Sequence, residues 1–423
     1  MWPLKAYALF HDPPHKALWF EHEDYRIYDK NSHEEEGAKL MYRVFEGLGL
    51  GGTLSEKERR AVAEADRLAA SFDRWALPPT PGGYWAKAKY LINPFNYDKK
   101  AEVKKPEAQE FRRGFQRFVE ALRGAAERGR GDEKRLYVYA YAAYELAWIK
   151  AGLPALPADT RAPTHTVFDH LYATASVLNW VLGARGCLAV ADIPGIQSVL
   201  KSARKAGDYR AGSMLVSLAA WGVAWRFMQR HGPDVLLSPT PRFNPLFYAQ
   251  LRRENPALWT LYAEVVGQLA GRQLGLAEAA AKFVEDILLR NSAIFPGTAY
   301  FALPECKEDE AEAYFEQSLS DLLEAAKGAE VDSLPIRLYP LGEDVRKIVS
   351  KALDGVKPDY LPFRWAYVAV DEARDGLEKW AKEVYGYAGD PERFLFARMM
   401  YLLNERKALR TPKTPAWFEK DGA

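Results

Sequence analysis

Apolar residues recur every three or four positions along much of the first 183 residues, which predicts a mostly helical N-terminal region. The clearest predicted helices cover residues 34–49, 54–77, 132–153 and 165–184. In the second of these, Ser55 and Glu58 have the spacing of a capping box at a helix start. The last is apolar on most sides, which predicts a buried helix.

The pattern changes after residue 184, where short apolar runs rich in strand formers alternate with helical stretches. Strands are predicted at residues 187–193, 234–239, 298–304 and 334–341. Long helices follow the first and the third of these strands. The resulting order of strand, helix, strand, strand, helix, strand is that of a ferredoxin-like domain. Helical periodicity then returns, with the clearest helices at 371–387 and 391–410.

These patterns together predict the α+β class. We expect a mostly helical domain at residues 1–183, a ferredoxin-like domain at 184–345 and a helical segment at 346–423. Within the first domain, residues 77–118 are rich in Pro and Gly and then in basic and aromatic residues. This insertion is typical of a long loop or lid.

Composition changes this picture little. A chain of 423 residues exceeds what one hydrophobic core usually organises, so more than one domain is expected. The net charge is +1, so no overall basic field indicates nucleic acid, and any polyanion site must be local. No apolar run approaches the ~20 residues that cross a bilayer, and the N-terminus does not resemble a signal peptide. We therefore expect no membrane association.

The chain has two cysteines, Cys187 and Cys306, which are far apart in the sequence and form no CxxC motif. This spacing is taken to exclude a disulfide framework and a cysteine zinc ribbon. It favours a reducing, cytoplasmic compartment.

Four of the seven histidines lie in two short segments that also carry aspartates. His11 and Asp12 form a doublet in FHDPPHK, and the second segment contains His165, Asp169 and His170. In a helix that begins there, His165 and Asp169 share one face at i and i+4. Imidazole and carboxylate ligands suit divalent transition ions such as Mn, Ni, Co, Fe or Zn. Such ions serve phosphodiester hydrolysis.

A catalytic interpretation assigns the cation to His11 and Asp12, while Lys16 offsets the charge on the scissile phosphate. A structural interpretation is equally open from the residues alone. His11 could cap a helix, Asp12 could begin a turn before two prolines, and His170 could be a core histidine with its hydrogen bonds satisfied. Asp159 and Arg161 likewise either pair across a turn or orient the second segment.

Two further stretches have the composition of nucleic-acid contacts. The insertion interleaves aromatic residues with lysines, as in a groove that stacks single strands: Trp85, Tyr90, Phe95 and Tyr97 with Lys87, Lys89, Lys99, Lys100, Lys104 and Lys105. Aromatic residues beside Pro and Gly also serve as loop anchors. Gly195 precedes a helical stretch whose basic residues either bind phosphates or form a solvated face: Lys201, Arg204, Lys205 and Arg210.

Four stretches read together resemble one family: FHDPPHK, LPADTRAPTHTVFDHLYATA, ADIPGIQSVLKSARKAGDYRAGSMLVSLAAW and LNERKALRTP. Their order is similar to that in the large polymerase/cyclase-like subunit of type III-B CRISPR effectors, the Cmr complex. The resemblance implies a circularly permuted HD nuclease domain, a first palm domain of ferredoxin type and a helical segment. It implies metal ligands at His11 and Asp12, and candidate ligands at His165, Asp169 and His170.

The resemblance also implies partners, namely other Cmr subunits, CRISPR guide RNA, target RNA and the single-stranded DNA that the HD domain cleaves. The sequence departs from the family in having no GGDD motif and no cysteine quartet, so we expect neither cyclase activity nor a zinc ribbon from this chain. The resemblance covers the N-terminal half of the family's chains, so the protein is either naturally split or compact, with a second palm possible on a separate chain, or the N-terminal half of a larger product. Lys16 also lies further from the doublet than the family lysine.

Two alternative functions remain open at this point. The chain could be a scaffold subunit that binds RNA and partner subunits and whose HD site has lost its activity. More weakly, it could be a free-standing HD phosphohydrolase acting on nucleotides. Metal content separates the first from a nuclease, and copurifying RNA and subunits separate the second.

Overall fold

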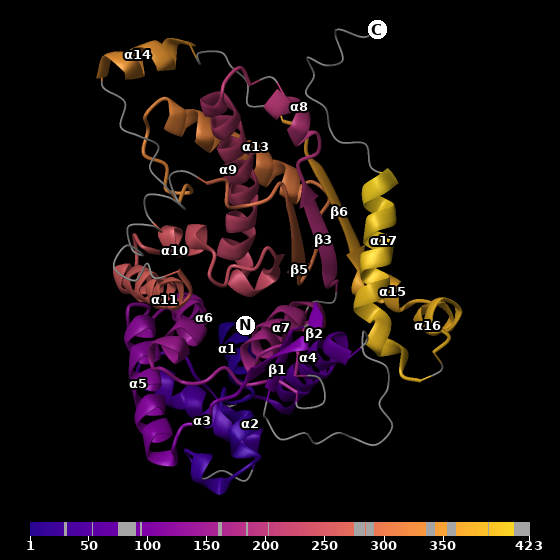
Figure 1. The fold of residues 1–423 in the computed structure, drawn as a ribbon. Helices are drawn as coiled ribbons and strands as arrows, with labels where there is room; N and C mark the ends of the chain where they lie inside the picture. Colours follow the sequence, from indigo (N-terminus) through magenta and orange to yellow (C-terminus); the bar gives the residue numbers. More distant parts are fainter. Residues whose placement is uncertain are drawn as a thin grey trace. The chain divides into compact units, whose positions relative to one another are not determined.

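The computed structural model describes residues 1–28, 32–52, 54–74, 90–93, 95–159, 163–182, 185–201, 203–274, 284, 292–335, 343–352, 361–387 and 389–409. The chain forms two compact units. Unit 1 comprises Met1–Ala184 and Arg374–Arg398, and unit 2 comprises Arg185–Ala373 and Met399–Ala423. Most described residues are helical and the strands pair antiparallel, so the class is α+β, as the sequence predicts (Figure 1).

Unit 1 is built mainly from helices. These are α1 (Trp2–Phe10), α2 (Lys16–Trp19), the 3₁₀ helix η1 (Glu23–Tyr25), α3 (His33–Phe45), α4 (Glu56–Arg74), α5 (Ala108–Glu127), α6 (Glu133–Lys150) and α7 (Val167–Leu182). Helices α6 and α7 are apolar on most sides and therefore lie buried in the core. There, Phe10 at the end of α1 stacks on Tyr144 of α6 with ring centroids 4.4 Å apart. The predicted capping box is confirmed, since Ser55 N–H donates to Glu58 at 2.8 Å.

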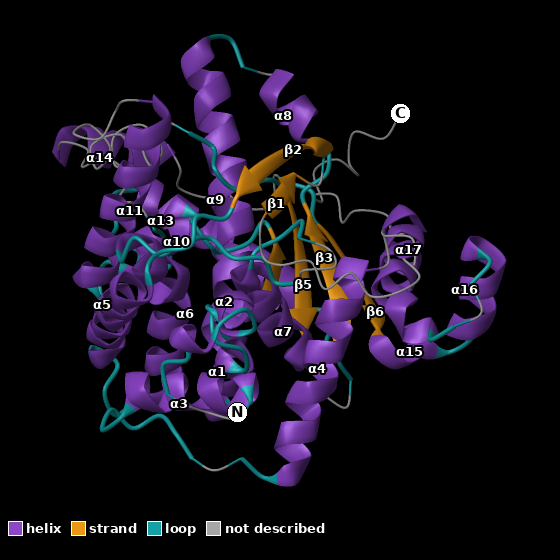
Figure 2. Cartoon of the chain, turned by 60° about the horizontal axis from the view of Figure 1, so that its bottom comes forward, coloured by secondary structure: helices purple, strands orange, loops and turns teal. Residues whose placement is uncertain are grey.

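The insertion contains a β-hairpin rather than the long loop expected from its composition. Strand β1 (Tyr90–Asn93) pairs antiparallel with β2 (Asn96–Glu102), and Figure 2 shows the two strands side by side. Residues 90–93 read Tyr-Leu-Ile-Asn, and three of these four residues are aromatic or apolar, a composition that suits a strand. The nearby Pro and Gly residues favoured a loop and outweighed this strand composition in the prediction. Residues 75–89 lie outside the described part of the chain.

The C-terminal part of unit 1 contains α16 (Leu377–Tyr385) and the 3₁₀ helix η5 (Pro391–Phe394), and α17 (Leu395–Leu409) follows. The helix predicted at 371–387 is divided into α15 (Val370–Arg374) and α16, because Gly376 adopts a φ of 67°, which ends a helix. Arg374 binds Glu64 of α4 at 3.0 Å and Glu392 of η5 at 3.3 Å. These ion pairs hold α4 against the C-terminal part of the unit.

Unit 2 is organised around a four-stranded antiparallel sheet. Its strands are β3 (Cys187–Asp192), β4 (Leu236–Ser238), β5 (Thr298–Leu303) and β6 (Arg364–Ala369), in the spatial order β4-β5-β3-β6. The first three agree with predicted strands, but the fourth does not. Residues 334 and 335 are not in a strand, and 336–341 lie outside the described residues. Strand β6 instead lies within the stretch predicted to be helical, because a short apolar run such as Trp365-Ala366-Tyr367-Val368 does not reveal its period.

The helices of unit 2 are α8 (Ile196–Lys201), α9 (Ala206–His231), the 3₁₀ helix η2 (Pro233–Val235), α10 (Pro245–Leu251), α11 (Pro256–Leu274), α13 (Glu310–Ala326) and α14 (Glu343–Ala352). Helices α9 and α13 pack on each other and on the sheet (Figure 1). Phe227 of α9 stacks on Trp365 of β6 with ring centroids 5.4 Å apart. None of the helices that the structure describes is long and apolar enough to cross a membrane.

The expectation about cysteines is wrong, because Cys187 and Cys306 form a disulfide with Cα atoms 6.1 Å apart. The antiparallel pairing of β3 with β5 places Cys187 opposite Leu303, and the chain reaches Cys306 just beyond the end of β5. Sequence distance therefore said nothing about spatial distance. The bridge also removes the cysteine argument for a reducing compartment.

Candidate metal centre

Three helices of unit 1 bring imidazole and carboxylate groups together. His11 and Asp12 directly follow α1, where two prolines prevent the helix from continuing. Asp66 lies within α4 and His170 lies near the start of α7. Oδ1 of Asp66 is 2.9 Å from Nε2 of His170 and 3.5 Å from Nε2 of His11. One ligand atom each of His11, Asp66 and His170 lies within 4.8 Å of the others, and Oδ2 of Asp12 lies 3.6 Å from Nε2 of His11 and 4.0 Å from Nε2 of His170. We call these four residues the metal cluster.

His11 presents Nε2 toward the cluster. Its Nδ1 lies 2.7 Å from the carbonyl oxygen of Ala8, and a hydrogen bond donated there leaves the lone pair on Nε2. Nε2 is buried and makes no hydrogen bond to any residue in the described part of the chain. Burial lowers the pKa of His11, but the carboxylates of Asp12 and Asp66 outweigh burial and raise it. A proton and a cation therefore compete for this nitrogen.

Asp12 is almost fully buried and stays ionised. Its Oδ2 accepts a hydrogen bond from Nζ of Lys16 at 2.6 Å and lies 3.6 Å from Nε2 of His11. Burial raises the pKa of Asp12, but the nearby His11 and Lys16 outweigh it and lower the pKa overall. Oδ1 lies 3.4 Å from Nε2 of His33 and makes no hydrogen bond among the described residues. It is a second buried atom suited to a cation.

Asp66 and His33 are the residues that the sequence analysis missed. Burial raises the pKa of Asp66, yet the nearby imidazoles of His11 and His170 outweigh burial and hold the pKa well below its usual range. A signal for Asp66 does exist, since it lies four residues after Val62 and three before Ala69, both buried. A carboxylate thus interrupts an apolar helix face. His33 begins α3 among acidic residues, where nothing in the sequence distinguishes it from a surface residue.

Of the second predicted segment, the structure brings only His170 into the metal cluster. Asp169 accepts hydrogen bonds from N–H and Oγ1 of Thr166 at 2.7 and 2.8 Å, so its carboxylate caps the start of α7. His165 precedes the helix, and its Nδ1 lies 3.4 Å from Oγ1 of Thr164. The i and i+4 relation assumed between His165 and Asp169 fails because α7 begins only at Val167.

The other predicted contacts are placed only in part. Arg161, Trp85, Lys87 and Lys89 lie outside the described residues, so the pairing of Asp159 with Arg161 stays a prediction. Tyr90 and Phe95 are exposed on the hairpin. Basic residues at α8 and the start of α9 are also exposed, and their role in phosphate binding stays a prediction: Lys201, Arg204, Lys205 and Arg210.

Helix α3 packs against the backbone of the His11–Asp12 doublet. Glu36 is fully buried and accepts hydrogen bonds from N–H of Ile27 at 2.8 Å and of Tyr28 at 3.0 Å, while Nε2 of His15 lies 3.3 Å away. The next residue, Gly37, touches the doublet itself. A Cβ there would lie 2.2 Å from the carbonyl oxygen of Phe10 and 2.8 Å from that of His11. The lack of a side chain at Gly37 is what allows α3 to approach.

Acid is expected to destabilise unit 1 through His15. Burial lowers the pKa of His15 despite the opposing effect of Glu36, because the buried ring favours the neutral form. The stability that the neutral ring contributes is therefore present above the ordinary value of 6.5 and is lost as the pH falls below it. The hydrogen bonds that Glu36 accepts outweigh its burial and lower its pKa, which adds a loss below about 4.5. In EDTA, the midpoint temperature of thermal unfolding should fall less from pH 7.5 to 5.5 for His15→Gln than for the wild type. Equal decreases would contradict the assignment.

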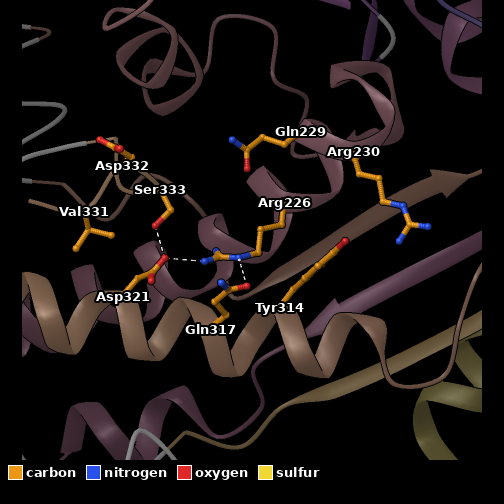
Figure 3. A pocket seen from close by; sticks show the side chains of 9 residues that line it. All are labelled: Arg226, Gln229, Arg230, Tyr314, Gln317, Asp321, Val331, Asp332 and Ser333. Carbon is orange, nitrogen blue, oxygen red and sulfur yellow. Dashed lines mark hydrogen bonds and ion pairs between the residues drawn. The ribbon is translucent and has the colours of Figure 1, made fainter.

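Unit 2 contains a separate open pocket of about 550 Å³ between α9, α13 and the residues around Asp332 (Figure 3). Its main cation is already bound, because Arg226 donates to Asp321 at 2.6 Å, to Ser318 at 3.0 Å and to Gln317 at 3.2 Å. Figure 3 shows Asp321 and Gln317 directed toward Arg226. Arg226 therefore links α9 to α13, and we assign this pocket no ligand.

Comparison with known proteins relates the chain to one family. Residues 188–328 match the family model described as "CRISPR-associated protein Cmr2, N-terminal". Over 279 residues the chain is 30% identical to the CRISPR system CMR subunit Cmr2 of Saccharolobus solfataricus, and over 350 residues it is 23% identical to Cmr2 of Pyrococcus furiosus. The chain is a relative of the Cmr2 large subunit of type III-B Cmr complexes.

The similarity to Cmr2 covers part of that subunit. The alignments include 59% and 68% of this chain but only 25% and 37% of the two Cmr2 proteins. The fold is similar to a chain of the type III-B Cmr-beta complex in its apo state, with a TM-score of 0.65 at 21% identity. It is equally similar to a chain of Cmr-beta bound to cognate target RNA, with a TM-score of 0.66. These matches cover 99% and 97% of this chain and 41% and 40% of the others.

Proposed function

We propose that this chain acts in an RNA-guided type III-B antiviral effector and cleaves single-stranded DNA at the metal cluster. The observation that carries the proposal is the convergence of His11, Asp66 and His170 from three separate helices, with Asp12 beside them. His11, Asp12 and His170 are buried, and burying such polar groups costs hydration that a ligand would restore, while Asp66 is 43% exposed and leaves the set open to solvent. Its donor set suits a divalent transition ion such as Mn or Ni.

The residues fit such an ion. Nε2 of His11 and Oδ1 of Asp12 are buried without a hydrogen bond to any described residue, and an ion would satisfy both. When bound, the ion would acidify a water and bind phosphoryl oxygens. Lys16 holds Oδ2 of Asp12 in place and is 24% exposed, so its ammonium group can also attract the DNA backbone. His33 is a further polar group at the rim of the site.

The proposed division of labour follows the expected domains. Residues 1–183 would form the HD nuclease domain, 184–345 the first palm and 346–423 a helical segment. The order β3, α9, β4, β5, α13, β6 supports the palm assignment, with its last strand beyond residue 345. We propose cytoplasmic assembly with other Cmr subunits, guide RNA and target RNA. The printed sequence has no GGDD motif, so cyclase activity is not assigned to it.

A scaffold without catalysis is the second candidate, and one observation favours it. The ammonium group of Lys16 already neutralises Oδ2 of Asp12, and this pairing could replace a metal ion. The two candidates differ in metal uptake. A scaffold of this kind would retain no Mn²⁺ after dialysis, whereas the nuclease would.

The deciding experiment measures Mn²⁺ content by mass spectrometry and cleavage of a 5′-labelled single-stranded DNA. The double variant His11→Ala, Asp12→Ala should lose both, because it removes two of the four cluster residues. The matched control is His22→Ala, Asp24→Ala, which removes an exposed histidine and aspartate 3.1 Å apart outside the cluster. This control should bind metal and cleave as the wild type does. Equal cleavage by the cluster variant and the wild type would refute the nuclease.

A further inference from the structure

The β1–β2 hairpin exposes aromatic side chains that a folded protein normally buries. Phe95, at the turn between the strands, is 97% exposed, and Tyr90 is 45% exposed. A two-stranded hairpin is only marginally stable by itself, and an apolar ring in water adds nothing to its stability. The exposed position of Phe95 therefore has no explanation in the folding of the hairpin. The ring is available to a partner that presents a flat, apolar surface.

The same hairpin carries cations without a compensating partner. Lys99, Lys100 and Lys104 are exposed and form no ion pair with any of the residues that the structure describes. Ile92 pairs with Lys100 across the strands, which places an apolar and a cationic side chain side by side on one face. Asp98 and Glu102 lie on the same strand, so the hairpin is not a simple positive patch but a patterned one.

A hollow lies between these groups. It has a volume of about 510 Å³, and its lining includes Leu91, Ile92, Phe95, Lys99 and Lys100. The volume falls in the ~300–1,000 Å³ range of pockets that hold small organic groups, so a nucleobase fits. Apolar and aromatic walls with two ammonium groups at the edge form the combination that stacks a base and contacts its phosphate.

The hairpin is fixed at two points to segments that carry the metal cluster. N–H of Ile92 donates to the carbonyl oxygen of Pro163 at 2.7 Å, and Pro163 lies seven residues before His170. After the hairpin, the carbonyl oxygen of Pro106 accepts from the hydroxyl of Tyr25 at 2.8 Å, and Lys105 binds Glu21. Tyr25 and Glu21 follow Lys16 closely in the sequence. The hairpin is therefore anchored to the same substructure as the candidate active site.

We infer that this hairpin is the single-strand binding surface of the nuclease, where Phe95 stacks on a base and Lys99 and Lys100 bind the flanking phosphates. The inference rests on the proposed function in taking single-stranded DNA as the occupant. Stacking favours a single strand over a duplex, since duplex bases are already stacked on each other. The unpaired lysines complement the negative phosphates of DNA, which favours DNA over a protein surface that has few acidic residues.

The test measures binding of a fluorescent oligo(dT) by anisotropy in EDTA, so that it does not depend on metal or cleavage. Phe95→Ala should weaken binding about 5- to 150-fold, the usual loss for one stacked base. Lys99→Ala, Lys100→Ala should reduce the slope of log affinity against log salt by about 0.7 for each lysine. Thermal unfolding should be unchanged in both variants, because the side chains are exposed.

The matched controls are Tyr42→Ala and Lys39→Ala on α3, where an exposed aromatic ring and a lysine lie 4.9 Å apart outside this hollow. They should bind as the wild type does. Hairpin variants that bind oligo(dT) normally would overturn the inference, even if the same variants no longer bound an RNA oligonucleotide. If binding depends on the hairpin but no variant or metal condition gives cleavage, the nuclease proposal fails and the binding surface stands.

Discussion

Asp66→Asn is expected to lower metal-dependent cleavage of single-stranded DNA by about 100-fold or more. Asp66 is the carboxylate that both His11 and His170 approach, at 3.5 and 2.9 Å, so the amide removes the negative charge on which both imidazoles converge. Loss of a group that merely orients a ligand costs roughly 10- to 100-fold in affinity or activity, and loss of a ligand should cost at least as much. The measurement is the rate of cleavage at saturating Mn²⁺, together with the Mn²⁺ dissociation constant.

A control on the same helix separates this effect from helix damage. Glu56→Gln changes an exposed carboxylate at the start of α4 that pairs only with the exposed Arg60 among the described residues, and it should cleave normally. In EDTA, Asp66→Asn should unfold at a lower temperature than the wild type, because the lowered pKa of Asp66 means that its charge stabilises the folded protein, so cleavage is compared at a temperature where both proteins are folded. Wild-type rates and Mn²⁺ affinity for Asp66→Asn would show that the cluster does not hold the catalytic ion.

Cys306→Ser is expected to lower the free energy of unfolding of unit 2 by about 4–5 kcal/mol. The bridge to Cys187 spans a sequence separation of 119 residues, and a closed loop of this size restricts the unfolded chain strongly. Cys187 is the buried first residue of β3, opposite Leu303 of β5, so the bridge links β3 to the segment after β5 at one end of the sheet. Chemical unfolding followed by tryptophan fluorescence measures the effect.

Reductant provides the internal control. The wild type in reductant should unfold at the same denaturant concentration as Cys306→Ser without it, and the variant should not respond to reductant. A wild type that resists reductant with no change in its unfolding midpoint, and a variant of equal stability, would contradict a stabilising bridge.

Local signals predicted the fold where one segment alone determines the structure. The capping box at Ser55 and Glu58 fixes the start of α4, and the apolar run at 187–192 fixes β3. Strand β6 was missed because its partner β3 lies far earlier in the chain, and only this pairing distinguishes Trp365-Ala366-Tyr367-Val368 from a short buried helix. The hairpin was missed for a similar reason, since its two strands define each other.

The candidate site shows the same limit. A histidine and an aspartate in sequence indicated His11 and Asp12, but Asp66 approaches them only because α4 packs against α7 and α1. Asp169 accepts hydrogen bonds from Thr166 at a helix start, a use of a carboxylate that the sequence does not distinguish from binding a cation, and its role as a ligand stays a prediction. Chemical type identifies candidates, and tertiary packing decides which of them meet.

Gly37 is as important for protein engineering as the cluster residues. It contributes no donor, no charge and no ring, yet the carbonyl groups of Phe10 and His11 occupy the space of any substituent it might gain. A deep mutational scan should therefore find glycine alone tolerated at this position. Anyone transplanting the four cluster residues into another scaffold would need to copy this gap as faithfully as the side chains it supports.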